Sequence, residues 1–464
     1  MTILFGPTTS YGFQTWTKQA PAGTPVSIYV AGMKANTVYH MRAVVQYGDG
    51  TTVKDVDRTF ETGSYPASSL PSIATTTTPG ATPEPGIEIL NTIDSTVEIS
   101  AADLSGNIIW AYNPGLALNG SSWLAPKQLA DGDFIAVVSP NSSAALTTDV
   151  PADAPNMVRE FDLAGNTIKQ ITMPQLNAAL AAANYDLTLL YFSHDITVLP
   201  NGHWLVLANT LKNVVLTGQT TPTQVLGDVI VDLDTNLTPV WVWNEFDHLD
   251  VNRHPWNFPD WTHTNALIYS PDDGNLVVSI RHQNWIVKVD YYNGTGTGDI
   301  LWHLGAGGDF KLLGGTHPQD WAYAQHGINF TTPNTTGIFG LGVMDNGDDR
   351  LYPGGPVGVT CDTDGSPACY STIPIFQINE SAKTATLVFH QILPGSLYSF
   401  FGGDTMMLDN GNIEYDLAGL APEGSQVFEV TNDSTPQTVW NLKLNNNYAY
   451  RAYRLPSLYP GVQW

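Results

Sequence analysis

Charged side chains are scarce in this chain, and basic ones are the scarcest. Charged residues make up only 13% of the 464 residues, and 18 lysines and arginines face 43 aspartates and glutamates, giving a formal net charge of −25. Nucleic acids and anionic membranes bind clusters of Lys and Arg. The composition therefore argues against both as partners. It also makes an arginine that stands alone among acidic residues worth noting.

Long apolar runs and cysteines are lacking as well. No apolar segment approaches the roughly 20 residues that cross a bilayer, and MTILFGPTTS at the start lacks the features of a signal peptide. Cys361 and Cys369, in CDTDGSPAC, are the only cysteines, and without a CxxC motif they make a poor zinc site. We expect them to form a disulfide in an oxidising compartment. A periplasmic or secreted protein is therefore favoured, whether or not a leader was removed.

Aromatic and uncharged polar residues are abundant instead. Hydrophobic residues make up 42% of the chain and aromatic residues 11%, enough for a large core. A surface of Asn, Thr, Ser, Gly and Pro favours strands and tight turns over helices, whose exposed faces are normally rich in Glu and Lys. We therefore predict an all-β protein. Its length favours one large unit beside a small one.

The chain divides at a segment rich in Pro, Thr and Ser. Residues 1–64 alternate with a two-residue period in PVSIYVAGM, TVYHMRAVVQY and TTVKDVDRTFETG. This pattern predicts a small β-sandwich that resembles a fibronectin type III module, with Tyr39 as its corner tyrosine. Residues 65–86, in SYPASSLPSIATTTTPGATPEPG, predict an extended linker. Residues 87–464 form the predicted large domain.

A blurred repeat runs through this large domain. A polar turn followed by an apolar or Trp-bearing strand recurs six times, beginning at Asp103, Asp162, Asp232, Asp290, Ile378 and Val430. Between the copies lies a second hairpin with an Asp-Gly or Asn-Gly turn, as in LADGDFIAVV, LPNGHWLVLAN, SPDDGNLVVSI, MDNGDDRLY and LDNGNIEYD. Two hairpins per unit give four strands, so about six units predict a six-bladed β-propeller. A double sandwich is the competing fold.

Three histidines stand at matching positions ahead of these turns. They are His194 in FSHDITVLPNG, His263 in THTNALIYSPDDG and His326 in QHGINFTTPNTTGIFGLGVMDNG. Because the first strand of a propeller blade lines the central channel, three neighbouring blades would each present one imidazole there. The hairpin after His263 returns at Arg281, which would meet His263 and Asn265 at one mouth of the channel.

The other histidines and most aromatic residues receive a structural interpretation. A lone histidine at a strand start is more often structural than catalytic, but three in register with an arginine favour a site. The histidines without this register are interpreted as structural or surface residues: His203, His248, His254, His282, His303, His317 and His390. Asp-rich turns such as DNGDD at Asp345 are interpreted as solvated, with a bound structural ion as the alternative. Trp261, Trp321 and Tyr323 lie beside the candidate histidines and are candidates to hold a flat ring.

Imidazoles, an amide and a guanidinium together favour an anion with several oxygens. Arg and protonated His bind such anions through charge-assisted hydrogen bonds. Neutral His also suits zinc, copper or iron, but a fixed arginine nearby opposes a second cation. GAGGD at Gly305 and FGGD at Phe401 lie in β context and are interpreted as turns, so no nucleotide signature is present. An oxyanion substrate, with no nucleotide, metal or other cofactor, fits best.

The residues that carry this site resemble the bacterial arylsulfate sulfotransferases, which move a sulfuryl group between phenols without a nucleotide donor. The resemblance lies in FSHDITVLPNGHWLVLAN, DWTHTNALIYSPDDGNLVVSIRHQNWIVKVD, ILWHLGAGGDF and WAYAQHGINF. It implies a small β-domain before a six-bladed propeller, an aryl sulfate donor, a phenolic acceptor and a ping-pong reaction. It also implies that His326 is the nucleophile and forms a sulfohistidine, with His263, Asn265 and Arg281 around the sulfuryl oxygens and His194 as a further donor.

Two other classes of function stay open on the residues alone. The first is a non-catalytic exported propeller that binds glycans or aromatic ligands. The second is a metal-dependent hydrolase on the same scaffold. The sequence is also compatible with a homo-oligomer.

Overall fold

The computed structural model describes residues 1–66, 69–93, 95–113, 115–140, 153–351, 360–361, 367–422 and 424–464. Most regular structure in these residues is strand, as predicted. The described helices are α1 (Met173–Ala182) and four short 3-10 segments, namely η2 (Glu245–Asp247), η3 (Arg281–Gln283), η4 (Tyr292–Gly294) and η5 (Gly395–Leu397). None of these described helices is long and apolar enough to span a membrane.

The N-terminal region forms one sheet in the order β2-β1-β3-β4, with β5 also paired to β3. Its strands are β1 (Thr2–Gly6), β2 (Phe13–Gln14), β3 (Val38–Gln46), β4 (Thr52–Lys54) and β5 (Arg58–Glu61). Residues 1–64 are all described and contain no second sheet, so the predicted sandwich is not what forms here, and PVSIYVAGM is not a strand. The Tyr39 hydroxyl does accept the Lys34 backbone N–H at 3.0 Å, as a corner tyrosine does.

The C-terminus takes the place of the missing second sheet. The rings of Phe5 and Phe13 lie 5.8 and 5.4 Å from that of Trp464, and Trp16 packs edge-on against Tyr459 at 5.1 Å. The Tyr459 hydroxyl donates to the Tyr29 carbonyl at 2.9 Å. These aromatic contacts cover the apolar face of the N-terminal sheet, so that face needs no sandwich partner from its own domain.

Part of the predicted linker is a strand. Within residues 65–86, β6 (Ser72–Thr77) pairs antiparallel with β30 (Thr438–Asn445). The alternation of SIATTT offers backbone groups and small side chains to a sheet edge, which satisfies the N–H and C=O groups that a free linker would leave to water. The composition did not predict this pairing.

The other strands in the described residues form six sheets, and each includes a run of four antiparallel strands. The first joins β31 (Tyr448–Leu455), β7 (Ile87–Ile93), β8 (Ile99–Asp103) and β9 (Ile108–Tyr112). The second is β10 (Ser121–Gln128), β11 (Phe134–Pro140), β12 (Met157–Phe161) and β13 (Thr167–Thr172), and the third β14 (Phe192–Val198), β15 (Trp204–Val214), β16 (Thr223–Leu233) and β17 (Pro239–Asn244). The fourth is β18 (Thr264–Ser270), β19 (Asn275–Ile280), β20 (Trp285–Val289) and β21 (Ile300–Leu304).

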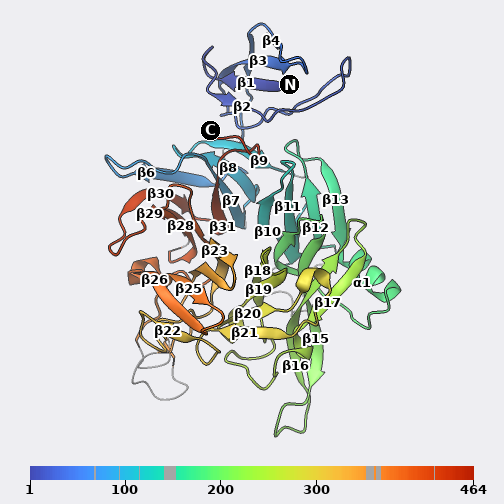
Figure 1. Ribbon diagram of the computed structural model, residues 1–464, viewed down its shortest axis with the longest axis vertical. Coiled ribbons are helices and arrows are strands. Elements are labelled where there is room, and N and C mark those ends of the chain that lie inside the picture. Colours follow the sequence, from blue (N-terminus) through green and yellow to red (C-terminus); the bar gives the residue numbers. More distant parts are fainter. Residues whose placement is uncertain are drawn as a thin grey trace.

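The last two sheets each gain a fifth strand. The fifth sheet is β23 (His326–Thr335), β24 (Ile338–Met344), β25 (Thr372–Asn379) and β26 (Thr384–Ile392), with β22 (Lys311–Leu313) parallel to β26. The sixth is β27 (Thr405–Met407), β28 (Ile413–Leu420), β29 (Gly424–Val430) and β30, with β6 at its edge. Figure 1 shows the six sheets following one another around the body of the molecule in chain order.

The sheets meet through their first strands, except that the sixth sheet reaches the first through its second strand, β28. β10 contacts β31 and β14, β14 contacts β18, β18 contacts β23, and β23 contacts β27, while β28 returns to β31 and closes the series. The first sheet is therefore composite, because the C-terminal strand β31 supplies its inner position beside β7. This pairing joins the two ends of the large domain, a connection that the repeat pattern did not predict.

Large side chains fill the space between neighbouring sheets. Trp243 of the third sheet packs with Leu267, Val278 and Val287 of the fourth, and all four are fully buried. The Trp243 indole N–H donates to the Gly298 carbonyl at 2.8 Å. Each such fully buried apolar side chain contributes on the order of 1.5–3 kcal/mol. The Trp-bearing strands of the repeat thus hold adjacent sheets together and fix the positions of their inner strands.

The predicted hairpins are present with one exception. The six polar turns connect β8–β9, β12–β13, β16–β17, β20–β21, β25–β26 and β29–β30. The exception is MDNGDDRLY, because the turn between β23 and β24 lies at Thr336 and Gly337 instead. Asp345, Asn346 and Asp348 follow β24 and are buried, so the prediction of a solvated turn there is wrong. This loop carries side chains into the candidate site.

Candidate active site

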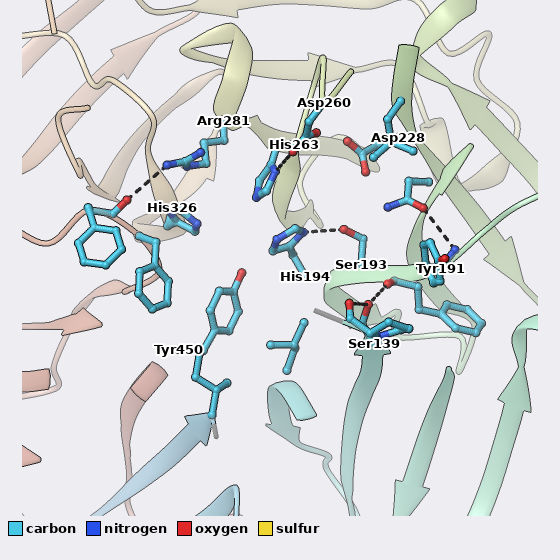
Figure 2. Close-up of a pocket in the computed structure, with 18 residues that line it drawn as sticks. Ser139, Tyr191, Ser193, His194, Asp228, Asp260, His263, Arg281, His326 and Tyr450 are labelled. Atoms are coloured by element: carbon cyan, nitrogen blue, oxygen red, sulfur yellow. Dashed lines mark hydrogen bonds and ion pairs between the residues drawn. The ribbon is translucent and has the colours of Figure 1, made fainter. Parts of the chain in front are cut away.

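A cavity of about 260 Å³ lies where the inner strands meet, and its wall holds all four basic residues singled out from the sequence. His194 lies on β14, His263 immediately precedes β18, His326 begins β23, and Arg281 begins η3 after β19. Figure 2 shows these four side chains gathered at one end of the cavity together with Tyr450 of β31. The register seen in the repeats therefore brings three imidazoles and one guanidinium into a single hollow.

The loop after β24 fixes the tautomer of His326. The Asn346 amide nitrogen donates to the carbonyls of Ser399 and Gly402 at 2.8 and 3.2 Å, which orients its oxygen toward His326. That oxygen accepts from His326 Nδ1 at 2.7 Å. Nδ1 therefore carries the proton, and Nε2 is left with a lone pair. A neutral imidazole held in this way is prepared to act as a nucleophile.

Burial keeps His326 neutral. The residue is 2% exposed, and burial, followed by the charge of Arg281, lowers the pKa of His326 well below its usual value. The pKa of His194 is lowered in the same direction by burial and by the neighbouring His263. Both rings are therefore neutral at pH 7, and Arg281 supplies fixed positive charge at this end of the cavity.

His263 is paired with a carboxylate. Asp260 Oδ2 lies 2.6 Å from His263 Nδ1, and the His263 and His194 rings are 4.5 Å apart. Burial acts to raise the pKa of Asp260, but the facing imidazoles of His263 and His282 lower it on balance. Asp260 thus stays ionised and orients the His263 ring through Nδ1, and His263 Nε2 has no hydrogen-bond partner among the described residues.

Arg281 is oriented by the protein through both of its terminal nitrogens, since NH1 lies 2.7 Å from His282 Nε2. Its NH2 group donates to Asp348 Oδ2 at 2.9 Å and to the Phe400 carbonyl at 3.3 Å, and its guanidinium lies 4.8 Å from the Trp256 ring centre. The Tyr398 hydroxyl contacts the other oxygen of Asp348. Arg281 Nε is buried without a hydrogen-bond partner among the described residues. The guanidinium is therefore oriented by the protein and keeps donor capacity for an anion.

One group of residues at this end has the spacing of a metal site. Single ligand atoms of Asp260, His263 and His282 lie within 4.8 Å of one another. However, Arg281 NH1 lies 2.7 Å from His282 Nε2, and His282 Nδ1 already donates to the Asp260 carbonyl at 2.8 Å. A fixed guanidinium at hydrogen-bond distance opposes a second cation, and His282 has no nitrogen left for it. The arrangement suits an anion better than a metal.

Four other residues expected near the substrate lie behind the cavity wall. Asn265 is fully buried, and its amide nitrogen donates to the Gln325 carbonyl at 2.7 Å, one residue before His326. Trp261 donates to the Arg253 carbonyl at 2.9 Å, while Trp321 and Tyr323 belong to the apolar core of the fourth and fifth sheets. None of the four is among the described residues that line the cavity. Packing between sheets takes up these large rings, and Asn265 supports the strand that carries His326.

Several residues of the site were missed in the sequence. Asn346 and Asp348 lie in DNGDD, and their polarity pointed to solvent although the loop folds inward. Asp260 stands three residues before His263, a spacing that offered a signal. Tyr450 lies far along the chain on the strand that closes the first sheet, and nothing local marks it. His282, interpreted as structural or surface, is buried against Trp256 with ring centres 4.5 Å apart and contacts Arg281.

The predicted disulfide is present and adjoins this loop. Cys361 and Cys369 are bonded to each other. The Cys361 backbone N–H donates to the Arg350 carbonyl at 3.0 Å, and Arg350 pairs with Asp345 at 2.5 Å. The bridge therefore lies next to the segment that carries Asn346 and Asp348.

Comparison with known families identifies the family of this chain. A family model described as Arylsulfotransferase (ASST) matches residues 50–454, which is most of the chain. The chain belongs to the arylsulfotransferase family. Membership supports aryl sulfotransferase activity in general and small-molecule substrates, in agreement with the resemblance seen in the sequence. The segments that carry the three histidines and Arg281 all lie inside the matched range.

Solved structures offer only remote likenesses. A putative 6-phosphogluconolactonase from Bacteroides fragilis is 11% identical with a TM-score of 0.36, and the match covers 98% of this chain and 97% of that one. The periplasmic gluconolactonase PpgL of Pseudomonas aeruginosa is 12% identical with a TM-score of 0.38, covering 78% and 97%. Scores this low carry no argument about the present chain. No curated protein matches it.

Proposed function

We propose that this protein transfers a sulfuryl group from an aryl sulfate to a phenol by a ping-pong reaction through a sulfohistidine at His326. Family membership supports aryl sulfotransferase activity. The observation that carries the finer proposal is the hydrogen bond from His326 Nδ1 to Asn346, which leaves the Nε2 lone pair in a cavity that also holds Arg281 and His263. A neutral imidazole is a competent nucleophile, and here burial keeps it neutral.

In the first half-reaction His326 Nε2 attacks the sulfur of the aryl sulfate. The N–S bond forms as the bond between sulfur and the bridging oxygen breaks, and the phenolate leaves with the electron pair. Sulfuryl transfer resembles phosphoryl transfer, so charge builds up on the peripheral oxygens and on the leaving oxygen. Arg281 stabilises the peripheral oxygens, and protonated His263 gives its proton to the phenolate.

The second half-reaction reverses these steps with another phenol. The acceptor hydroxyl gives its proton to His263 as its oxygen attacks sulfur, and the N–S bond breaks to restore neutral His326. His194, neutral and 4.5 Å from His263 between ring centres, is positioned as a further hydrogen-bond partner. Asn265 acts through Gln325 as a positioning residue, since its amide holds the residue before the nucleophile. No metal or nucleotide takes part in this scheme.

The surrounding architecture also enters the proposal. The closed series of six sheets, each with a run of four antiparallel strands, supports a six-bladed propeller with the cavity on its axis. The Cys361–Cys369 disulfide supports an exported, periplasmic or secreted protein.

The decisive experiment traps the intermediate. The protein is mixed with a nitrophenyl sulfate, quenched within one turnover, weighed intact and mapped to the modified residue. We expect a gain of one sulfuryl group on His326 and its removal when a second phenol is added before the quench. A label on another residue would mean that the nucleophile is misassigned. Transfer without any covalent label would replace the ping-pong scheme by direct transfer between bound substrates.

A further inference from the structure

The end of the cavity opposite His326 is lined by polar side chains, and none of the described residues there is basic. Tyr191, Asn209 and Asp228 line it together with Ser139 and Ser193. Figure 2 shows Asp228, Tyr191 and Ser139 on the far side of His194 from His326 and Arg281. A substrate whose reacting oxygen meets His326 therefore extends its other end toward these groups.

Most polar side chains at this end are already engaged by the protein. Ser139 Oγ donates to the Phe192 carbonyl at 2.5 Å, Ser193 Oγ lies 2.5 Å from His194 Nδ1, and the Asn209 side-chain oxygen accepts the Tyr191 backbone N–H at 3.3 Å. These contacts reduce what the three side chains offer to a ligand. Asp228 differs from them.

Asp228 uses one of its two oxygens within the protein. Oδ2 accepts from Thr262 Oγ1 and from the Thr264 backbone N–H, each at 2.8 Å. Oδ1 has no hydrogen-bond partner within the described part of the chain, although the side chain belongs to a residue only 4% exposed. A carboxyl oxygen that lines a cavity and is left unmatched by its own fold is available to a ligand.

The neighbourhood of Asp228 favours its neutral form. The closest acidic neighbour is Glu245, which is fully buried, accepts the Asp228 backbone N–H at 3.1 Å and accepts Thr264 Oγ1 at 2.5 Å. Neither carboxyl group forms an ion pair with a Lys or Arg of the described residues. Burial and then Glu245 raise the pKa of Asp228 well above its usual value, and burial raises that of Glu245 to about 7. Asp260, the other acidic group facing this pair, acts in the same direction.

The position of the proton follows from the hydrogen bonds. Oδ2 already receives two donors, so a proton on Asp228 sits on Oδ1 and faces the cavity. A phenolic hydroxyl or another uncharged oxygen of the ligand accepts this hydrogen bond. A ligand with a methyl group at the same place would leave the buried Asp228 O–H without a hydrogen-bond partner. The loss of this hydrogen bond lowers the affinity for such a ligand.

We propose that Asp228 is a specificity-determining residue that selects aryl substrates carrying a second hydroxyl at the end remote from the reacting oxygen, that is, diphenols and their monosulfates. This inference rests on the proposed function and names the substrate class of the same cavity. It assigns no role in bond breaking to Asp228, because the group lies across the cavity from His326.

The test compares acceptors of equal size. With one nitrophenyl sulfate as donor, kcat/KM is measured for hydroquinone against 4-methylphenol, and for 4,4′-dihydroxybiphenyl against 4-hydroxy-4′-methylbiphenyl. The wild type is expected to prefer the hydroxylated member of at least one pair by about tenfold or more, the discrimination typical of a lost buried hydrogen bond. The preference should fall to within about twofold in Asp228→Ala and persist in Asp228→Asn, whose amide N–H₂ replaces the donor. Dividing variant ratios by the wild-type ratio cancels the intrinsic reactivity of each phenol.

A matched control lies at the same end of the cavity. Ser139→Ala removes a hydroxyl that already donates to Phe192, so it should leave the preference unchanged. A wild type without preference in either pair, a preference that survives in Asp228→Ala, or its equal loss in Ser139→Ala would each overturn the proposal. The wild-type comparison within the biphenyl pair, whose remote substituent scarcely alters the reacting hydroxyl, stands even if a variant fails to fold, which thermal melting shows. Absence of transfer to every acceptor would contradict the proposed function itself, a different result from transfer without selection.

Discussion

Two buried arginines of this molecule hold different kinds of partners. Arg454 on β31 is ion-paired with Glu88 at 2.9 Å, Glu414 at 2.9 Å and Glu429 at 3.3 Å, and it joins the first sheet to the sixth. Arg281 is about equally buried, at 9% exposed against 6%, but it has one carboxylate partner, Asp348. Its other side faces the cavity.

The comparison separates structural from functional burial of charge. The guanidinium of Arg454 meets carboxylates from three strands, so removing it leaves several acids uncompensated in the interior. Arg281 is oriented by Asp348 and Phe400 but retains donor capacity toward a hollow lined by imidazoles. Burial and charge alone do not mark an active site. What marks it is a buried charge whose partners are incomplete and whose open side faces a cavity.

The largest expected effect comes from removing the nucleophile. His326→Ala should abolish the covalent sulfuryl intermediate and lower kcat/KM by about 10³-fold or more, since no other group replaces Nε2. Intact mass after quenching and initial rates measure the two effects. His203→Ala, on a histidine paired with Asp232 at 3.0 Å and outside the described cavity wall, serves as the control and should keep normal activity. A variant of His326 that still accumulates a sulfuryl adduct would move the nucleophile elsewhere.

Substituting the two arginines tests the comparison directly. Arg281→Ala should lower kcat by about 10²- to 10³-fold, as expected for the loss of one preorganised anion donor. Its unfolding free energy should change by less than about 2 kcal/mol, because Asp348 is left beside a cavity that admits water.

The reverse pattern is expected for Arg454. Arg454→Ala should cost roughly 3–5 kcal/mol of stability, because three buried carboxyl groups lose their counterion. The folded fraction should keep nearly normal kcat. Chemical denaturation and rates normalised to folded protein distinguish the two patterns. Equal losses of stability and of kcat in both variants would contradict the assignment of a functional role to Arg281 and a structural role to Arg454.

A smaller effect is expected for the amide that orients His326. Asn346→Leu should lower kcat by about 10- to 100-fold, because both tautomers of His326 then become available and only one presents the Nε2 lone pair. Asn346→Asp keeps an oxygen that accepts from His326 Nδ1, so it should retain most of the wild-type kcat although it adds a charge. Imidazole nitrogen NMR shifts of His326 report the tautomer. If Asn346→Leu leaves that tautomer unchanged, Asn346 has no positioning role.

The smallest expected effect is on the pH dependence of stability. The acids around Arg454 and the histidines near Arg281 should change stability with pH in opposite directions. Burial raises the pKa of Glu88 from 4.5 to about 7, so its contribution is fully present below pH 4.5 and is lost as pH rises through about 7. Burial lowers the pKa values of His194 and His326 below 6.5, so their contribution is present above pH 6.5 and is lost as pH falls through their folded values.

Two variants separate these contributions. Glu88→Gln should gain stability relative to the wild type between pH 5 and pH 8, and His194→Gln should gain it as pH falls from 6.5 to 4.5, each by about 1 kcal/mol. Unfolding free energies measured across this pH range test both signs. Parallel pH profiles of the two variants would contradict the assigned protonation states.

The local sequence was informative wherever one strand or one turn decides the outcome. The polar turns, the Trp-bearing strands and the positions of His194, His263 and His326 follow from two-residue alternation and turn chemistry. The same reasoning failed for DNGDD, because the polarity of Asn346 and Asp348 resembles that of a solvated turn. Their hydrogen-bond partners, His326 and Arg281, lie 20 and 67 residues away.

By itself, then, the sequence determined that this chain is built of strands, that three imidazoles recur at equivalent points of a repeat, and that Arg281 ends the hairpin that follows His263, since these are properties of short segments. Only the tertiary structure decided which side chains share the cavity. It placed Tyr450 and Asp228 in the wall, moved Asn265, Trp261, Trp321 and Tyr323 behind it, and paired the C-terminal strand with β7. These outcomes depend on the packing of sheets and on the pairing of buried polar groups across the chain, which no local pattern records.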